Sequence, residues 1–476
     1  MVRLFQAGEQ EWSPAVIAEF QFAPEKADPG MPGKGVGDLV VFPREAGAYT
    51  VLVSLGKAEN FSLETVRRAG GALGKWLSGS GAEELAINVD SLQAAGKEYA
   101  QFDLAEAVLT GLTLGSYRFD RYKKQDEDAT YVTVGLLSEG KPLVDEKLVE
   151  RVIAITQAVI FARDLAHEPA NVINPVSLAE RAQQVAEQAG LTVKVFDEQQ
   201  LADMGAGAIL AVGKGSRSQP RLIVLEYPGY EPEPGAQPVV LVGKAITFDT
   251  GGYSIKSTEG IVGMKYDKCG GVDVLATMQA AAALKVKTPL VGIISAAENM
   301  ISAEAYRPDD IITTMSGKTV EIISTDAEGR LVLSDALTYA QREYQPRAII
   351  DLATLTGGVV VALGRVRAGL LSNNDELANA LYKSGEATAE RLWRLPLDEE
   401  YSRAMKGEDA DLKNSGGREG HCILGGAFLK AFVDDGVPWA HLDIAGVADI
   451  NKDQPYTPKG ATGFGVRLLL HYLENL

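Results

Sequence analysis

Short apolar runs recur between residues 192 and 352, and several of them show no alternation of polar and apolar side chains. The runs lie at 192–196, 208–212, 221–227, 238–242, 290–294 and 348–352. Strands that are buried on both faces have this pattern. Helical patterns follow near 271–284 and 331–342. The alternation predicts an α/β fold in which a mostly parallel sheet is covered by helices on both faces. Such sheets bind ligands beyond the carboxyl ends of their strands.

A second, smaller alternation occupies the first 145 residues. Strands are expected at 15–22, 38–42, 49–55 and 85–89, and helices at 63–77 and 101–114. An apolar stripe at spacings of three and four residues then predicts one long helix ending near Ala166. The chain of 476 residues is long enough for two domains. We expect a small N-terminal α/β domain for assembly or regulation (1–145), a connecting helix (146–170) and a larger catalytic domain (171–476).

Composition restricts the partners of the protein. The formal net charge of −18 argues against nucleic acid or an anionic membrane as the main partner. Two cysteines in a chain of this length favour a reducing compartment, which indicates a cytoplasmic protein. The N-terminal sequence has no long apolar run after a basic start, so neither a signal peptide nor a transmembrane helix is expected.

Candidate functional residues gather in three short segments that contain glycine, 242–256, 264–271 and 324–331. The carboxylates are Asp249, Asp267, Asp326 and Glu328, and the cations are Lys244, Lys256 and Arg330. Each acidic residue comes just after an apolar run or just before a predicted helix. Because such positions meet at the carboxyl edge of a parallel sheet, we expect these side chains to lie close together.

Singly, these acids have ordinary structural explanations. Asp249 before a glycine pair is typical of a turn, and Asp326 with Glu328 is typical of a helix N-terminus. Together they indicate a metal site, because adjacent buried anions require cations nearby. The four histidines show no zinc-ligand spacing. We therefore expect two divalent ions per subunit, with Mn²⁺ favoured and Zn²⁺ or Mg²⁺ as alternatives. This chemistry alone also leaves open another two-metal hydrolase, such as a phosphoesterase.

Four motifs carry a resemblance to a known family. Residues 243–252 read Gly-Lys-Ala-Ile-Thr-Phe-Asp-Thr-Gly-Gly, residues 254–256 read Ser-Ile-Lys, residues 265–267 read Lys-Tyr-Asp, and residues 325–331 read Thr-Asp-Ala-Glu-Gly-Arg-Leu. In this order and spacing they resemble the leucyl (cytosol) aminopeptidase family of two-metal exopeptidases. The resemblance covers essentially all of 165–476 and is weak before that.

The resemblance implies a role for each matching residue. The metal ligands would be Lys244, Asp249, Asp267, Asp326 and Glu328, with Asp249 and Glu328 bridging both ions. Lys256 and Arg330 would be the catalytic pair, with a bicarbonate ion at Arg330 as general base. The residues that bind the substrate would be Met264, Thr354, Leu355 and Gly357.

The resemblance also implies the reaction and the assembly. The protein would release N-terminal residues, leucine among them, from peptides with a free N-terminus, and it would form a homohexamer. Some members of the family also bind DNA as accessory factors. That alternative requires a concentrated basic groove, and residues 1–145 contain no basic run.

Overall fold

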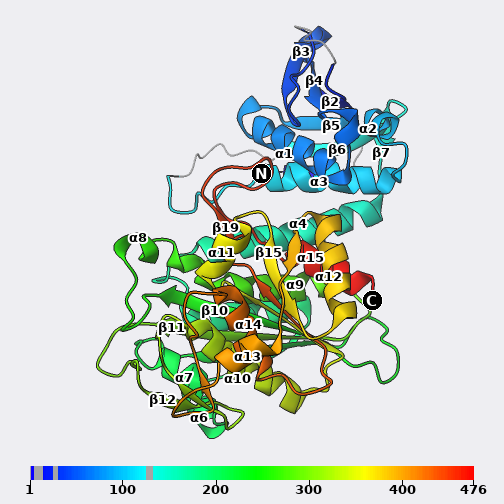
Figure 1. Ribbon diagram of the computed structural model, residues 1–476. Helices are drawn as coiled ribbons and strands as arrows, with labels where there is room; N and C mark the ends of the chain where they lie inside the picture. Colours follow the sequence, from blue (N-terminus) through cyan, green and yellow to red (C-terminus); the bar gives the residue numbers. More distant parts are fainter. Residues whose placement is uncertain (1, 5–13, 25–29, 125–131) are drawn as a thin grey trace. The chain divides into compact units, whose positions relative to one another are not determined.

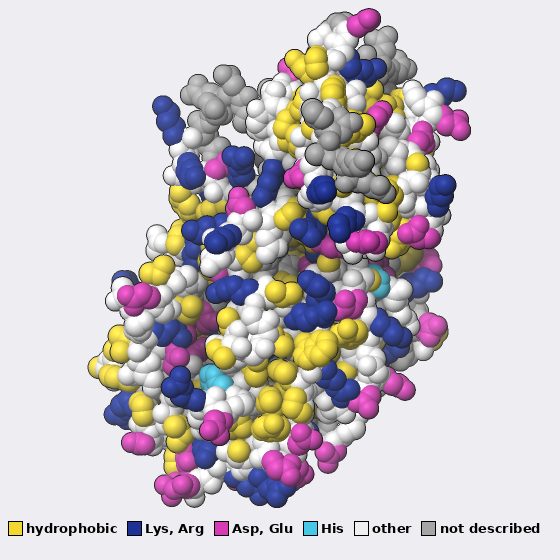
Figure 2. Space-filling view, turned by 45° about the horizontal axis from the view of Figure 1, so that its top comes forward, with side chains coloured by type: hydrophobic (Ala, Val, Ile, Leu, Met, Phe, Trp, Pro, Cys, Tyr) yellow, Lys and Arg dark blue, Asp and Glu magenta, His cyan; other side chains and the backbone are white. Residues whose placement is uncertain are grey.

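The computed structural model describes residues 2–4, 14–24, 30–124 and 132–476 (Figure 1). The chain divides into two compact units, Met1–Ile160 with Asn451–Lys459 and Phe161–Ile450 with Gly460–Leu476. No helix within the described ranges combines the length and the apolar character needed to cross a lipid bilayer. On the face shown in Figure 2, basic and acidic side chains are interspersed with apolar ones.

The first unit is a seven-stranded sheet with helices packed on it. Its order is β1-β6-β5-β2-β4-β3, and β7 pairs with β6. The strands are β1 (Val2–Leu4), β2 (Val16–Gln21), β3 (Leu39–Pro43), β4 (Tyr49–Ser54), β5 (Glu84–Asn88), β6 (Val132–Ser138) and β7 (Lys141–Leu143). Helices α1 (Leu63–Ser80) and α3 (Gln101–Gly115) pack closely against each other. A Cβ on Gly111 would lie 1.9 Å from the carbonyl oxygen of Arg67, so this contact requires glycine. The long helix α4 (Glu146–His167) follows.

The second unit contains an eight-stranded sheet of order β16-β15-β18-β14-β10-β11-β9-β8. The strands are β8 (Thr192–Phe196), β9 (Arg221–Tyr227), β10 (Val239–Asp249), β11 (Leu290–Asn299), β14 (Ala348–Ala353), β15 (Ala368–Ser372), β16 (Leu392–Arg394) and β18 (Trp439–Asp443). The central strands β18, β14, β10 and β11 run parallel, and antiparallel pairs lie toward the edges.

Helices cover both faces of this sheet. One layer contains α5 (Pro175–Ala189), α9 (Cys269–Ala283), α12 (Asp375–Thr388) and α15 (Val466–Glu474). The other contains α7 (Gly207–Gly213), α10 (Glu328–Glu343) and α14 (His421–Lys430) and packs over a large buried apolar core. β10 therefore lies between α9 and α10. The architecture confirms the predicted fold class.

One predicted strand is wrong. Residues 208–212 form most of helix α7 rather than a strand. Five apolar residues are too few for periodicity to separate a buried strand from a buried helix. The amides of Ala208 and Ile209 donate to Oδ2 of Asp335, at 2.9 and 3.0 Å, so a carboxylate from α10 satisfies the start of this helix.

Candidate metal centre

The acidic side chains of the three sequence clusters converge at the carboxyl edge of the central sheet. Asp249 is the last residue of β10, and Asp267 lies in a 3₁₀ turn (Met264–Lys268) that precedes α9. Asp326 precedes α10, and Glu328 is its first residue. The sequence pattern predicts this helix only from residue 331. The helix instead begins at Glu328, which lets a carboxylate occupy the first turn, where the helix dipole favours negative charge.

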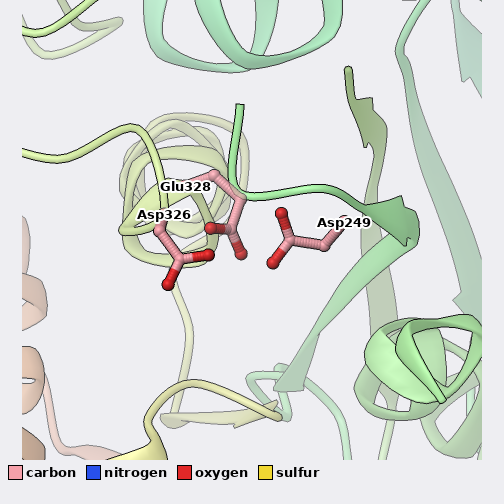
Figure 3. A group of neighbouring side chains, drawn as sticks. All are labelled: Asp249, Asp326 and Glu328. Carbon is pink, nitrogen blue, oxygen red and sulfur yellow. The ribbon is translucent and has the colours of Figure 1, made fainter. Parts of the chain in front are cut away.

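Three of the carboxylates form one cluster. Asp249, Asp326 and Glu328 each offer an oxygen, and these oxygens all lie within 4.8 Å of one another. Figure 3 shows the three carboxyl groups pointing toward one another from β10 and the start of α10. Asp249 and Glu328 are buried, whereas Asp326 is exposed. The cluster therefore has one open side.

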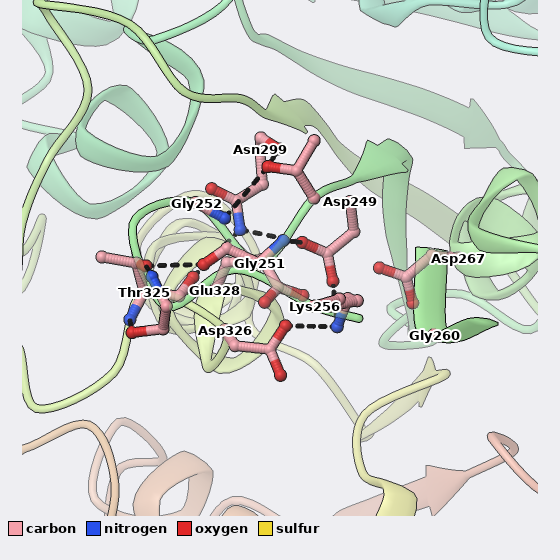
Figure 4. Close-up of polar contacts among 12 residues, drawn as sticks. Asp249, Gly251, Gly252, Lys256, Gly260, Asp267, Asn299, Thr325, Asp326 and Glu328 are labelled. Atoms are coloured by element: carbon pink, nitrogen blue, oxygen red, sulfur yellow. Dashed lines mark hydrogen bonds and ion pairs between the residues drawn. The ribbon is translucent and has the colours of Figure 1, made fainter. Parts of the chain in front are cut away.

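Two lysines compensate this negative charge. Nζ of Lys244 lies 2.9 Å from Oδ1 of Asp267 and 2.9 Å from Oε1 of Glu328, in the buried part of the site. Nζ of Lys256 lies 2.8 Å from Oδ2 of Asp249 and also contacts Asp326 (Figure 4). Four carboxylates still outnumber the two ammonium groups.

The imbalance is visible in the pKa values of the site. Burial, reinforced by Asp249, raises the pKa of Glu328 to about 8. Burial also raises the pKa of Asp267 to about 6, although Lys244 opposes this rise. Burial alone would lower the pKa of Lys244, but Asp267, Glu328 and Asp249 raise it above its ordinary value. The protein alone therefore does not fully stabilise the ionised carboxylates, and an additional cation would.

The donor atoms fit a divalent ion. Among the described residues, Oδ2 of Asp267 and Oε2 of Glu328 are buried without a hydrogen-bond partner. A buried acceptor without a partner costs about 1–3 kcal/mol, and more when it is charged. Carboxylate oxygens are the ligands that Mn²⁺ and Mg²⁺ prefer, and Zn²⁺ accepts them as well. The two oxygens and the three-carboxylate cluster therefore suit metal ligation.

Residues outside the predicted set hold these ligands in place. Nδ2 of Asn299, at the end of β11, donates to Oδ1 of Asp249 at 2.8 Å and to the carbonyl of Thr325 at 2.9 Å. Gly251 and Gly252 adopt positive φ angles of 84° and 62° in the turn after β10. A Cβ on Gly252 would lie 2.8 Å from Oγ1 of Thr325, so this close approach requires glycine. No sequence pattern pointed to Asn299, because the predicted strand 290–294 ends before it, whereas β11 continues to Asn299.

The predicted substrate-binding residues lie beside the same edge. Oγ1 of Thr354, just after β14, donates to Oδ1 of Asp267 at 2.6 Å, and the carbonyl of Thr354 accepts from Lys244 at 2.9 Å. Leu355 is half-buried and follows Thr354, and Gly357 begins helix α11 (Gly357–Leu363). Met264 is half-buried at the start of the turn that carries Asp267.

The predicted catalytic pair differs in exposure. Lys256 is partly exposed on the loop after β10. Arg330 lies in the first turn of α10 and is buried, with Nη1 donating to the carbonyl of Asn414 at 2.8 Å. Oδ1 of Asn414 in turn accepts from the amide of Ile323 at 2.8 Å. Asn414 therefore holds both Arg330 and the segment that leads to Asp326.

Two family models match the chain. The catalytic domain of the cytosol aminopeptidase family matches residues 160–470, and the N-terminal domain of the same family matches residues 38–126. The first match contains every residue of the site described above. The resemblance inferred from the motifs is therefore confirmed.

Known proteins agree with the family models. A probable cytosol aminopeptidase of Geobacter sulfurreducens is 46% identical over 428 residues, which are 89% of this chain and 84% of the relative. Another, of Syntrophotalea carbinolica, is 44% identical and covers 92% of this chain and 88% of the relative. The solved structure of the bottromycin maturation enzyme BotP in complex with Mn is 32% identical, with a TM-score of 0.88, over 97% of this chain and 99% of BotP. The chain therefore belongs to the cytosol aminopeptidase family, and it is an aminopeptidase that hydrolyses peptide bonds.

Proposed function

We propose that the protein removes N-terminal residues, leucine among them, from peptides, with two divalent metal ions held by five of its side chains. The proposed ligands are Lys244, Asp249, Asp267, Asp326 and Glu328. The observation that carries this proposal is the pair of buried, unpartnered oxygens on Asp267 and Glu328 beside the three-carboxylate cluster. Mn²⁺ is the favoured ion, and BotP, which is similar in structure, was solved with Mn.

The bound metals would polarise the scissile carbonyl and lower the pKa of an attacking water. Lys256 would donate to the oxyanion that develops on that carbonyl, because its ammonium group lies at the open side of the cluster. Arg330 would hold an anionic base, such as bicarbonate, since its guanidinium is fixed by Asn414. Met264 and the segment from Thr354 to Gly357 would receive the side chain of the leaving residue.

Asp443 supports the proposed pocket. Its Oδ1 accepts from the amide of Leu355 at 3.1 Å, and its Oδ2 accepts from Oγ1 of Thr356 at 2.6 Å. These bonds fix the loop after β14 against the neighbouring strand β18. The loop after β14 therefore orients both the pocket and Asp267, because Thr354 on the same loop donates to Asp267.

The names of the curated relatives support a cytoplasmic location. We extend the proposal to a homohexamer, in line with the family resemblance. Sedimentation of the full chain would test the assembly, with a hexamer expected and a stable monomer contradicting it.

The metal-binding proposal is tested by substitutions that keep side-chain size. Asp249→Asn and Glu328→Gln should lose bound metal and hydrolysis of leucine p-nitroanilide, while circular dichroism stays unchanged. Asp435→Asn, at an exposed carboxylate outside the site, is the matched control and should behave as wild type. Unchanged metal content and turnover in both site variants would overturn the ligand assignment.

A further inference from the structure

A buried polar group lies under the site, on strands β14 and β18. Asp351 of β14 and His441 of β18 are paired in register, and Nδ1 of His441 lies 2.5 Å from Oδ1 of Asp351. Nε1 of Trp439 donates to Oδ2 of the same carboxylate at 2.7 Å. All three side chains are fully buried. Because Asp351 is an acceptor toward both neighbours, it keeps a proton on Nδ1 of His441, and Nε2 is then an acceptor in the neutral form of the ring.

Two buried nitrogen atoms of complementary type are left in this region. Within the described part of the chain, neither Nε2 of His441 nor Nε of Arg330 has a hydrogen-bond partner. Nε of a guanidinium always carries a hydrogen and is a donor. Leaving either group unpaired in the interior costs about 1–3 kcal/mol. One is a donor and the other an acceptor, so one bridging water would satisfy both.

Packing places Arg330 and the strand neighbour of His441 under the same turn of α14. Nη2 of Arg330 lies 3.5 Å from the position that a Cβ on Gly425 would occupy. Leu371, the cross-strand neighbour of His441 on β15, lies 2.7 Å from the corresponding position on Gly426. Arg330 and Leu371 therefore approach the helix at adjacent glycines, and His441 is paired with Leu371 in the sheet.

Electrostatics agree with this proximity. Burial alone would lower the pKa of His441, but Asp351 and Asp443 raise it above its ordinary value, and the positive charge of Arg330 opposes this rise. Asp443 lies two residues after His441 on β18, so the two side chains share one face of the sheet. The negative charge of Asp443 also acts on Arg330, whose pKa burial lowers. Arg330, His441 and Asp443 therefore form one charged neighbourhood.

We propose that His441, in the neutral tautomer that Asp351 fixes, is a positioning residue for Arg330 and accepts from its Nε–H through one buried water that bonds Nε2. Together with the bond from Nη1 to Asn414, this contact would hold the guanidinium at two points. Nη2 is then available for the reacting groups. The inference rests on the proposed function, in which Arg330 acts on an anion at the site.

Two substitutions test the two nitrogen atoms of the imidazole separately. In His441→Asn, the amide nitrogen overlays Nδ1, so the bond to Asp351 is kept and the acceptor toward Arg330 is lost. In His441→Gln, the terminal amide overlays Nε2, so an oxygen can still accept from Arg330 while the bond to Asp351 is lost. If His441 only stabilises the fold through Asp351, His441→Asn should be the more active variant. If His441 positions Arg330, His441→Gln should be the more active variant.

The experiment measures kcat and KM for leucine p-nitroanilide, Mn²⁺ affinity by calorimetry, and the thermal unfolding midpoint for both variants. We expect His441→Asn to lose kcat by about 10–100-fold, as is typical of residues that orient catalytic groups. Mn²⁺ affinity should stay unchanged, and His441→Gln should retain most of the wild-type kcat.

Three results would overturn the inference: equal kcat in both variants and wild type, an equal loss in both folded variants, or a loss confined to His441→Gln. Metal-dependent turnover by the wild-type protein tests the proposed function separately. The ratio of the two variants tests the role of His441, so the two failures are distinguishable.

Discussion

Nζ of Lys244 lies 2.9 Å from Oε1 of Glu328, and both side chains are almost fully buried. Removing the lysine leaves Glu328 and Asp267 without their nearest cation. Breaking a buried pair from one side costs about 3–5 kcal/mol. We expect Lys244→Met to lower the unfolding free energy of the metal-free protein by that order at alkaline pH, where both carboxylates are ionised.

Chemical denaturation of the metal-free protein measures this effect. Lys287→Met, at an exposed lysine on the same unit, is the control and should change stability little. Equal stability of Lys244→Met and the control would show that Lys244 does not compensate the buried acids.

Asn299 is expected to orient Asp249 for metal binding. It donates to Oδ1 of Asp249 and leaves Oδ2 facing Lys256. Loss of a residue that orients a ligand weakens metal binding by about 10–100-fold. Calorimetric titration of chelator-stripped Asn299→Ala with Mn²⁺ should show this loss, with Asn475→Ala at the exposed C-terminal end as control. Wild-type affinity in Asn299→Ala would refute the orienting role.

The hydroxyl of Thr354 should set the pH range of metal uptake. It donates to Asp267 at 2.6 Å, and this bond lowers the pKa of a carboxyl that burial raises to about 6. In Thr354→Val the pKa of Asp267 rises further, so Mn²⁺ uptake should shift to higher pH. Thr354→Ser keeps the hydroxyl and should follow the wild type. Coinciding pH curves for the valine and serine variants would count against this contact.

Metal uptake should release protons in a pH-dependent way. The pKa of Glu328 is raised to about 8 in the metal-free protein, so this group is still protonated at neutral pH. A folded-state pKa above the unfolded value stabilises the metal-free fold at low pH, and that contribution is lost as the pH rises through about 8. Metal ligation requires the ionised carboxylate. The number of protons released per Mn²⁺ bound should therefore fall by about one between pH 7 and pH 9.

Calorimetry in buffers of different ionisation enthalpy counts the released protons. If Lys244 becomes a ligand, its ammonium group releases a proton at both pH values, because its pKa is raised. A proton count that does not change with pH would mean that Glu328 is already ionised before metal binds.

The sequence predicted the fold class and the segments of the site because both depend on local patterns. The apolar runs that became β10, β11 and β14 are buried on both faces, and Asp249 ends the first of these strands. Helix α7 was mistaken for a strand because its short apolar run carries no decisive periodicity.

The supporting contacts of the site could not be predicted in the same way. Asn299, Asn414 and His441 act through partners 50, 84 and 90 residues away in the chain. No local pattern indicates which distant polar residue will satisfy a buried ligand. Such pairs appear only when the fold brings distant segments together.

The most direct test of the account is hydrolysis of leucine p-nitroanilide by chelator-stripped protein during a Mn²⁺ titration, with N-acetyl-leucine p-nitroanilide as the blocked substrate. We predict that activity appears with added metal and only on the substrate with a free amine, because that amine would bind a metal held by the carboxylate cluster. Equal cleavage of the blocked substrate, or full activity without metal, would contradict the account.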